Sequence, residues 1–201
     1  MQPTRLLVAT TNRHKIREIE QLLSGLPLEL LTLGERLELL PPEETGQTFA
    51  ENAREKALYY AHATGELTLA EDSGLEIEAL GGAPGVHSAR FGGADAPYSQ
   101  KFALIYRELQ QRNALGSPAR FVSALALAKG NEILFETEGT VEGRIAPEPK
   151  GEGGFGYDPI FFYPPFGQTL AEAGERKSAV SHRAAAIRSL RRFLKPPTAS
   201  P

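Results

Sequence analysis

LTLAEDSG, at residues 67–74, is the stretch that decides the expected fold. Its first four residues form an apolar, β-compatible run that two carboxylates, Glu71 and Asp72, follow directly. Ser73 and Gly74 come next, and the glycine indicates a turn at the end of the strand. In open α/β sheets ligands bind at the carboxyl ends of strands, and Mg²⁺ is held there by one or two carboxylates plus substrate phosphates. The alternative is a strand that ends in a solvated acidic turn, which is common.

The composition of the 201 residues is that of an ordinary soluble globular protein, with 41% hydrophobic and 23% charged residues. We expect one domain at residues 1–195 and a disordered tail at residues 196–201. The net charge of −3 argues against a nucleic-acid partner. The absence of cysteine excludes disulfides, zinc–thiolate sites and thiol nucleophiles. No apolar run approaches the roughly 20 residues of a membrane helix, and no signal-peptide pattern is present, so we expect no membrane partner and a cytoplasmic location.

Apolar periodicity predicts alternating strands and helices. Expected strands are residues 5–10, 28–33, 67–70, 75–80, 120–129, 132–143 and 159–163. One helix is expected at the segment TTNRHK and beyond, with Ile16, Ile19, Leu22 and Leu23 on one face. Three more helices are expected at residues 48–63, 98–112 and 181–194. Thr48 and Glu51 have the spacing of a capping box, and Gly130-Asn131 joins two long strands as a hairpin. The pattern predicts an α/β fold with a long mixed sheet flanked by helices.

Polar and basic residues occupy the first predicted strand-to-helix junction. They are Thr10, Thr11, Asn12, Arg13, His14 and Lys15. The first N–H groups of a helix favour anions, and a lysine adds positive charge, so the segment could bind phosphate. A helix N-cap with a solvated lysine is an equally acceptable interpretation. Glu43 and Glu44, in a loop before the capped helix, could join Asp72 around a metal or could be surface charges.

Two further segments carry candidate binding residues. GEGGFGYD, at residues 151–158, places Phe155 and Tyr157 on either side of Gly156, so that one ring could stack on a base. Near the start of the last helix, Lys177, His182 and Arg183 could bind phosphate or a base carbonyl. The same helix carries Arg188, Arg191 and Arg192, which we interpret as a solvated face rather than an RNA or protein site.

Two other kinds of active site are excluded. No serine has the GxSxG context of a nucleophile, so a Ser-His-Asp triad is not expected. The four histidines, at positions 14, 62, 87 and 182, are not clustered as ligands of a transition metal.

Five motifs, in this order, resemble the family of non-canonical purine nucleoside triphosphate pyrophosphatases, the house-cleaning enzymes for inosine and xanthosine triphosphates. They are ATTNRHK (9–15), EETGQTFAENAREKA (43–57), AEDSGLEIEALGGAPGVHSARF (70–91), GGFGYDPIFF (153–162) and KSAVSHR (177–183). The resemblance covers residues 6–194. Thr11 stands where the family usually has Gly or Ser, and Glu71 where it often has Asp.

The resemblance implies a role for each candidate residue. Asp72 would be the general base, with Lys15 as a second catalytic residue, and Mg²⁺ would be held by Asp72, Glu43 and Glu71, with Glu44 as an alternative ligand. The triphosphate would bind Thr10, Thr11, Asn12, Arg13, His14 and Lys15. Base, sugar or phosphate would contact Ser73, Phe155, Gly156, Tyr157, Asp158, Lys177, His182 and Arg183. The family also implies two lobes with a central substrate cleft and a homodimer, for which the loop at residues 81–93 could form part of the surface.

The implied reaction is hydrolysis of ITP, dITP or XTP to the monophosphate and pyrophosphate. A donor facing the purine 6-oxo group would select these substrates, because a 6-amino group would lose that hydrogen bond. The alternatives are a pyrophosphatase for other modified nucleotides and a regulatory module that binds a nucleotide without cleaving it.

Overall fold

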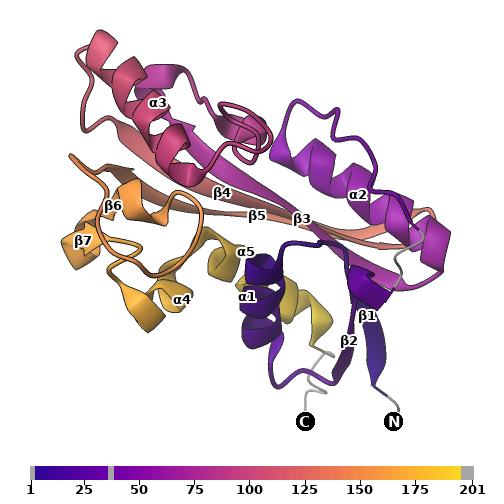
Figure 1. Ribbon diagram of the computed structural model, residues 1–201. Helices are drawn as coiled ribbons and strands as arrows, with labels where there is room; N and C mark the ends of the chain where they lie inside the picture. Colours follow the sequence, from indigo (N-terminus) through magenta and orange to yellow (C-terminus); the bar gives the residue numbers. More distant parts are fainter. Residues whose placement is uncertain (1–2, 36–38, 196–201) are drawn as a thin grey trace. The chain divides into compact units, whose positions relative to one another are not determined.

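The computed structural model describes residues 3–35 and 39–195 (Figure 1). The tail expected at residues 196–201 lies outside the described residues. The helices are α1 (Arg13–Leu23), α2 (Phe49–Thr64), α3 (Tyr98–Gln111), α4 (Lys177–Val180) and α5 (His182–Leu194). The strands are β1 (Thr4–Val8), β2 (Leu28–Thr32), β3 (Leu67–Ile77), β4 (Pro118–Lys129), β5 (Glu132–Ile145), β6 (Phe161–Tyr163) and β7 (Gln168–Thr169).

The strands form one seven-stranded sheet in the order β2-β1-β3-β4-β5-β6-β7. β1 pairs in parallel with β2 and β3, whereas β6 pairs antiparallel with β5 and β7. The expectation of an α/β fold with a mixed sheet is therefore confirmed. Nowhere in residues 3–35 and 39–195 does a helix have the length and apolar character that crossing a bilayer requires.

The chain forms two compact units, and each has its own apolar core. The first unit comprises Met1–Asp72, Ser123–Gly139 and Arg183–Pro201. In β1, Leu6 and Val8 pack against α1 and α5 in a core that includes Ile19 and Ile187. Successive strand residues point to opposite faces. In Figure 1, α2 accordingly lies on the other side of these strands from α1 and α5.

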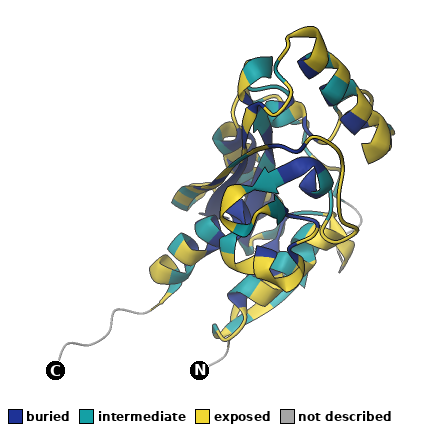
Figure 2. Cartoon of the chain, turned by 90° about the vertical axis from the view of Figure 1, so that its left-hand side faces the viewer, coloured by how far each residue is buried: buried dark blue, intermediate teal, exposed yellow. Residues whose placement is uncertain are grey.

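The second unit comprises Ser73–Val122 and Thr140–His182. Phe102, Ile105 and Leu109, spaced along one face of α3, pack with Leu75 and Ile77 of β3. All five side chains are nearly inaccessible to solvent. In Figure 2 the buried residues likewise concentrate along the strands, while the helices expose their outer faces.

β3 is longer than the sequence pattern indicated. A turn was expected at Gly74, but the strand continues without interruption for 11 residues, from Leu67 to Ile77. A Cβ at Gly74 would lie 2.3 Å from Ser88 Oγ and 2.7 Å from Gly85 O. The glycine therefore permits a close approach of a distant loop rather than a change of chain direction, and the expectation of two separate strands was wrong.

Candidate active site

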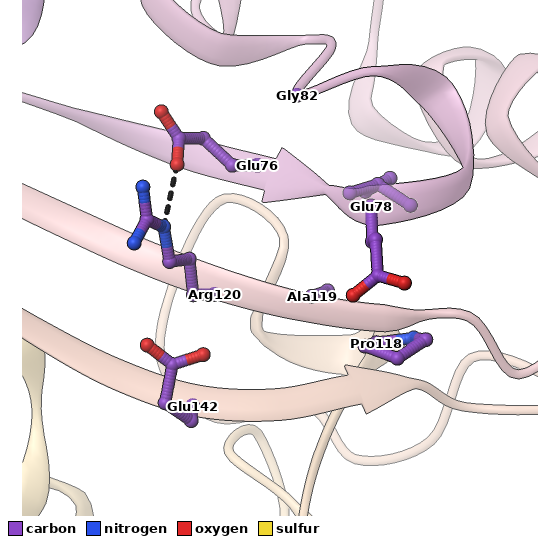
Figure 3. Close-up of a pocket in the computed structure, with 8 residues that line it drawn as sticks. Glu76, Glu78, Gly82, Pro118, Ala119, Arg120 and Glu142 are labelled. Atoms are coloured by element: carbon purple, nitrogen blue, oxygen red, sulfur yellow. Dashed lines mark hydrogen bonds and ion pairs between the residues drawn. The ribbon is translucent and has the colours of Figure 1, made fainter.

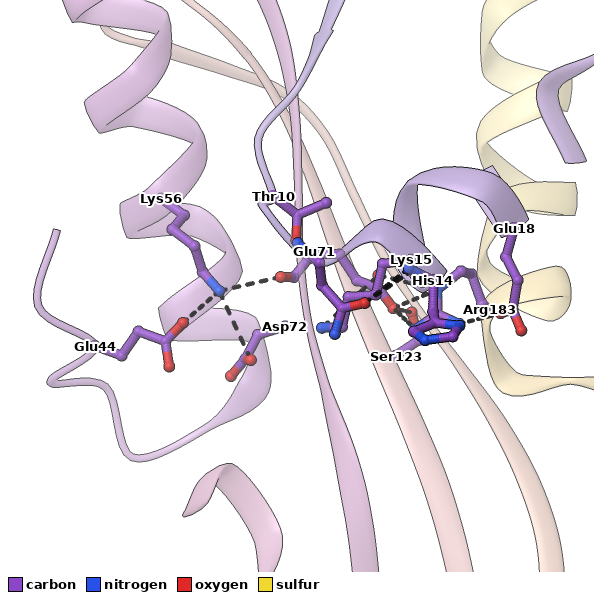
Figure 4. Close-up of polar contacts among 11 residues, drawn as sticks. Thr10, His14, Lys15, Glu18, Glu44, Lys56, Glu71, Asp72, Ser123 and Arg183 are labelled. Atoms are coloured by element: carbon purple, nitrogen blue, oxygen red, sulfur yellow. Dashed lines mark hydrogen bonds and ion pairs between the residues drawn. The ribbon is translucent and has the colours of Figure 1, made fainter. Parts of the chain in front are cut away.

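Glu71 and Asp72, which are adjacent in β3, face opposite sides of the sheet (Figure 4). Side chains alternate along a strand, so neighbouring residues must diverge in this way. Asp72 contacts residues of α2, and Glu71 contacts residues of α1 and α5. The two carboxylates therefore have separate surroundings within the first unit.

Asp72 is 7% exposed and lies among polar groups of α2 and the preceding loop. Its Oδ2 accepts a hydrogen bond from Asn52 Nδ2 at 3.0 Å, and its Oδ1 is 3.8 Å from Lys56 Nζ. The same ammonium donates to Glu44 Oε1 at 2.6 Å and to the Glu71 carbonyl at 3.1 Å. Burial raises the pKa of Asp72, and the nearby Glu44 adds to the rise, although Lys56 and Asn52 oppose it. A carboxylate with a raised pKa is a more effective proton acceptor.

Glu71 is 2% exposed and forms a buried ion pair with Arg183, which is 0% exposed. Arg183 Nε donates to both Glu71 oxygens at 2.9 and 3.0 Å, and Ser123 Oγ donates to Oε1 at 2.7 Å. Arg183 also binds Glu18 of α1 through Nη1. Burial alone would raise the pKa of Glu71. The charges of Arg183 and Lys15 and the hydrogen bonds from Arg183 and Ser123 outweigh that effect and hold the pKa below its usual range.

The N-terminus of α1 carries the predicted triphosphate-binding segment, of which Thr11, Asn12, Arg13 and His14 are exposed. Asn12 is the N-cap, and its Oδ1 accepts from the His14 and Lys15 backbone N–H groups at 3.0 and 3.2 Å. Thr10 Oγ1 accepts from Asn12 N in turn. Since the cap already occupies two N–H groups, a phosphate at this helix would depend more on the side chains.

Lys15 lies between this exposed loop and the buried pair. Its ammonium is 4.0 Å from Glu71 Oε2, and its side chain is 16% exposed. Burial lowers the pKa of Lys15, and the charges of Arg183 and Lys56 lower it further, whereas Glu71 opposes the change. Lys15 thus brings an amino group to a helix start, where anions are favoured.

The structure distinguishes the two candidate glutamates of the loop before α2. Glu43 is exposed, whereas Glu44 is half-buried and reaches Lys56 beside Asp72. Within the described part of the chain, no three His, Cys, Asp or Glu side chains form a group that could hold a metal ion by itself. The metal-ligand roles predicted for Glu43 and Glu71 stay predictions.

The motif interpretation assigned no role to four residues of this cluster, which are Asn52, Lys56, Ser123 and Glu18. Asn52 and Lys56 are four residues apart and therefore share one face of α2. Asn52 also precedes Ala53 in the buried stripe of that helix, and a polar residue there was a usable signal. Ser123 and Glu18 gave no such signal, because their partners are 52 and 165 residues away in the sequence.

In the second unit the structure brings three predicted residues together. Asp158 Oδ2 accepts from Lys177 Nζ and from the Phe155 backbone N–H, each at 2.8 Å. The Lys177 ammonium also lies 4.6 Å from the centre of the Phe155 ring. Gly154 has a φ of +70°, and a Cβ there would meet Asp158 Oδ2 at 2.1 Å. The glycine-rich loop is therefore fixed by a buried aspartate–lysine pair.

Other predicted contacts of this unit differ in how accessible they are. Tyr157 is 3% exposed, packs in the apolar core, and donates from its hydroxyl to Ser88 O at 2.8 Å. His182 is buried and stacks on Phe121, with ring centres 4.9 Å apart. Phe155 and Ser73 are only half-buried. Of the two aromatic side chains beside Gly156, Phe155 is therefore the better candidate for stacking on a base.

A hollow of about 300 Å³ in the second unit is lined by none of the predicted residues (Figure 3). Glu76, Glu78 and Glu142 line it, and Arg120 Nε donates to Glu76 Oε2 at 2.6 Å. The three carboxylates exceed the single guanidinium in charge, so this hollow is unsuited to a polyphosphate.

The basic face of α5 has structural partners. Arg191 Nη1 donates to the Leu22 and Ser24 carbonyls at 2.7 and 2.8 Å, and Arg192 Nη2 donates to Ser189 Oγ at 3.0 Å. Arg191 thereby satisfies carbonyl groups at the C-terminus of α1. These contacts give Arg191 a structural role, whereas Arg188 and Arg192 are exposed, as expected for a solvated face. That the face binds neither RNA nor a protein stays a prediction.

Comparison with known proteins gives matches over nearly the whole chain. The model of the Ham1 family matches residues 6–193. A dITP/XTP pyrophosphatase of Desulforamulus reducens is 43% identical over 191 residues, which are 94% of this chain and 95% of that protein. Another dITP/XTP pyrophosphatase, of Thermus thermophilus, is 46% identical over 187 residues, 92% of this chain and 89% of the relative.

The fold of this chain is also similar to that of a solved structure. The HAM1 protein of Coxiella burnetii superimposes with a TM-score of 0.88 at 37% identity, covering 95% of this chain and 98% of that one. The family model, the relatives and the solved structure thus agree over the β-strands and helices that carry the candidate residues. The chain belongs to the Ham1 family.

Proposed function

We propose that this protein hydrolyses non-canonical purine nucleoside triphosphates, namely ITP, dITP and XTP, to the monophosphate and pyrophosphate. Its family membership and the names of its relatives, dITP/XTP pyrophosphatases, support this activity. The observation that carries the proposal is the buried carboxylate of Asp72, set beside Lys56 and Glu44 within the first unit. A carboxylate and positive charges are what phosphoryl transfer to water requires.

In the proposed reaction the oxygen of water forms a bond to the α-phosphorus. The bond from that phosphorus to the bridging oxygen breaks, and pyrophosphate leaves with the bonding electrons. Asp72 orients the water and takes its proton. Negative charge grows on the phosphoryl oxygens, and the ammonium groups of Lys15 and Lys56 stabilise it.

The donor set of the first unit fits Mg²⁺. Asp72 and Glu44 provide hard carboxylate oxygens that lie close together, because the Lys56 ammonium is 2.6 Å from Glu44 Oε1 and 3.8 Å from Asp72 Oδ1. Mg²⁺ binds through one or two carboxylates and completes its shell with water and substrate phosphates, so a third carboxylate is unnecessary. We assign Asp72 and Glu44 as its ligands, while Glu43 and Glu71 remain predicted alternatives. The bound metal would neutralise phosphate charge and lower the pKa of a coordinated water.

Glu71 and Arg183 have a different place in the proposal. The buried pair that they form supports β3 and α5 directly behind Lys15. A phosphate contact by Arg183, as the family motif implies, stays a prediction, and the hydrogen bonds to Glu71 and Glu18 favour a supporting role.

We assign recognition of the base and sugar to the second unit. Phe155, half-buried beside the Lys177 ammonium, offers an aromatic face for a purine. Tyr157 and Asp158 hold the loop that carries Phe155 and Gly156. A donor to the 6-oxo oxygen, for which His182, Arg183 and backbone N–H groups are the predicted candidates, would disfavour adenine, because its amino group cannot accept that hydrogen bond. The homodimer and the cytoplasmic location stay predictions.

Product analysis tests the proposed reaction. Wild-type protein with Mg²⁺ should release pyrophosphate from ITP, dITP and XTP and much less from ATP. Asp72→Asn should keep the fold, as judged by circular dichroism, and lose about 10²–10⁴-fold in rate. Release of orthophosphate without pyrophosphate would contradict the assignment. Nucleotide binding without any product would favour the regulatory alternative, and activity confined to other modified nucleotides would favour a different substrate class.

A further inference from the structure

Asn52, in the first turn of α2, is a buried amide whose two ends bind different segments of the first unit. It is 1% exposed. Its Nδ2 donates to Asp72 Oδ2 at 3.0 Å, and its Oδ1 accepts from the Gly46 backbone N–H at 2.9 Å. Only this orientation of the amide places its NH₂ donor against the carboxylate and its oxygen acceptor against the backbone N–H. Asn52 therefore links β3 to the loop that precedes α2.

Gly46 can approach Asn52 closely because it has no side chain. A Cβ on Gly46 would lie 2.7 Å from Asn52 Oδ1 and 2.8 Å from the Glu51 Cβ. Since real Cβ atoms do not approach so closely, any other residue would push the loop away from Asn52. Gly46 follows Glu44 by two residues, so the position of Glu44 depends on the same anchor.

The same amide also restricts the Asp72 carboxylate. With Oδ2 engaged by Asn52, the other oxygen, Oδ1, is the one that lies 3.8 Å from Lys56 Nζ, and Lys56 in turn binds Glu44. One side chain thus fixes both the rotation of Asp72 and the approach of the loop that carries Glu44.

We propose that Asn52 is a positioning residue that sets the separation and orientation of the Asp72 and Glu44 carboxylates for Mg²⁺. The inference rests on the proposed function, in which these carboxylates are the ligands. Partners that orient a metal's ligands typically contribute 10- to 100-fold in metal affinity or activity. Asn52 itself touches neither the metal nor the reacting atoms.

The test compares Asn52→Leu, which keeps the approximate volume but removes both hydrogen bonds, with Thr48→Ala. Thr48 caps the same helix by accepting from Glu51 N at 3.1 Å and takes no part in the Asn52 link. The control therefore loosens the start of α2 while it leaves the two carboxylates connected. Gly46→Ala provides an independent way to disturb the link, from the loop side.

For Asn52→Leu we expect about a 10- to 100-fold rise in the Mg²⁺ concentration for half-maximal rate, and a similar fall in kcat. The KM for ITP at saturating Mg²⁺ should change less than about threefold, because the nucleotide contacts remain. Gly46→Ala should give the same pattern to a smaller extent. Thr48→Ala should leave the Mg²⁺ dependence at the wild-type value. Equal behaviour of Asn52→Leu and Thr48→Ala would overturn the proposal.

Two measurements that need no turnover separate this inference from the proposed activity. Exchange of the Gly46 amide hydrogen should accelerate in Asn52→Leu but not in Thr48→Ala. The thermal shift produced by Mg²⁺ alone should shrink in Asn52→Leu but not in Thr48→Ala. If wild-type protein released no pyrophosphate, the proposed activity would be refuted. The two measurements would still decide the role of Asn52. Unchanged exchange and an unchanged thermal shift in Asn52→Leu would refute that role.

Discussion

The buried pair of Glu71 and Arg183 allows a quantitative prediction for Arg183→Met. Methionine fills most of the space but removes every hydrogen bond of the guanidinium. Glu71, 2% exposed, would retain only the Ser123 hydroxyl at 2.7 Å and the Lys15 ammonium at 4.0 Å among the contacts described above. Breaking a buried pair by removing one partner costs about 3–5 kcal/mol. Because Ser123 and Lys15 remain, we expect a loss near the lower limit, about 3 kcal/mol.

A double-mutant cycle identifies the cause. If the loss comes from an isolated buried charge, then adding Glu71→Met to Arg183→Met should recover stability, because no uncompensated carboxylate remains. We expect the double variant to exceed the single Arg183→Met variant by at least about 1 kcal/mol in free energy of unfolding. Urea denaturation followed by circular dichroism measures the stability of the wild type, of Arg183→Met, of Glu71→Met and of the double variant.

The pH dependence provides a second check with a defined sign. In the wild type the pKa of Glu71 is held below its usual range, so the contribution of this group is complete above the unfolded pKa. It is lost as the pH falls toward the folded pKa. In the Arg183→Met variant the guanidinium is missing, so burial should raise the pKa of Glu71 instead. The buried carboxyl group can then bind a proton. The stability gap between the two proteins should therefore narrow as the pH falls from neutral.

Two results would refute this reasoning. One is a loss below about 1 kcal/mol for Arg183→Met, which is the range of a solvated ion pair. The other is a double variant no more stable than the single one, which would mean that packing rather than charge causes the loss.

Three further predictions concern other parts of the molecule. Thr48→Ala removes the capping hydrogen bond to Glu51 N and should lower the free energy of unfolding by about 1 kcal/mol, measured by urea denaturation. Gly74→Ala places a methyl group 2.3 Å from Ser88 Oγ and should cost about 1–3 kcal/mol, whereas an unchanged melting temperature would contradict the close approach. Chelation by EDTA should abolish pyrophosphate release, and added Mg²⁺ should restore it; activity that persists in EDTA would exclude a metal requirement.

Local signals predicted most of the fold. The capping box of Thr48 and Glu51 is present with both of its hydrogen bonds, and α2 begins where it indicates. The succession of β1, α1 and β2 also matches the predicted alternation of strands and helices. Such features depend on residues within a few positions of one another, which makes them readable from sequence.

The errors arise where a residue responds to a distant part of the chain. Gly74 was interpreted as a turn because its partner, the loop of Gly85 and Ser88, is separate in sequence. The base contact of Tyr157 stays a prediction, but the sequence did not show that its ring lies in the core and that its hydroxyl donates to the Ser88 carbonyl, 69 residues away. Asn52 also received no predicted role from the sequence, because its hydrogen-bond partner, Asp72, lies 20 residues later. A single sequence does not reveal such pairs.

The divergence of Glu71 and Asp72 makes β3 sensitive to its register. The two acids have distinct roles only because they occupy consecutive positions of a pleated strand. Deleting one residue between Leu67 and Ala70 would shift the pairing by one position and exchange the faces of both acids. The shorter aspartate would then face Arg183, and the longer glutamate would face Lys56. Changes in chain length in this strand should therefore be tolerated far less well than substitutions that preserve its length.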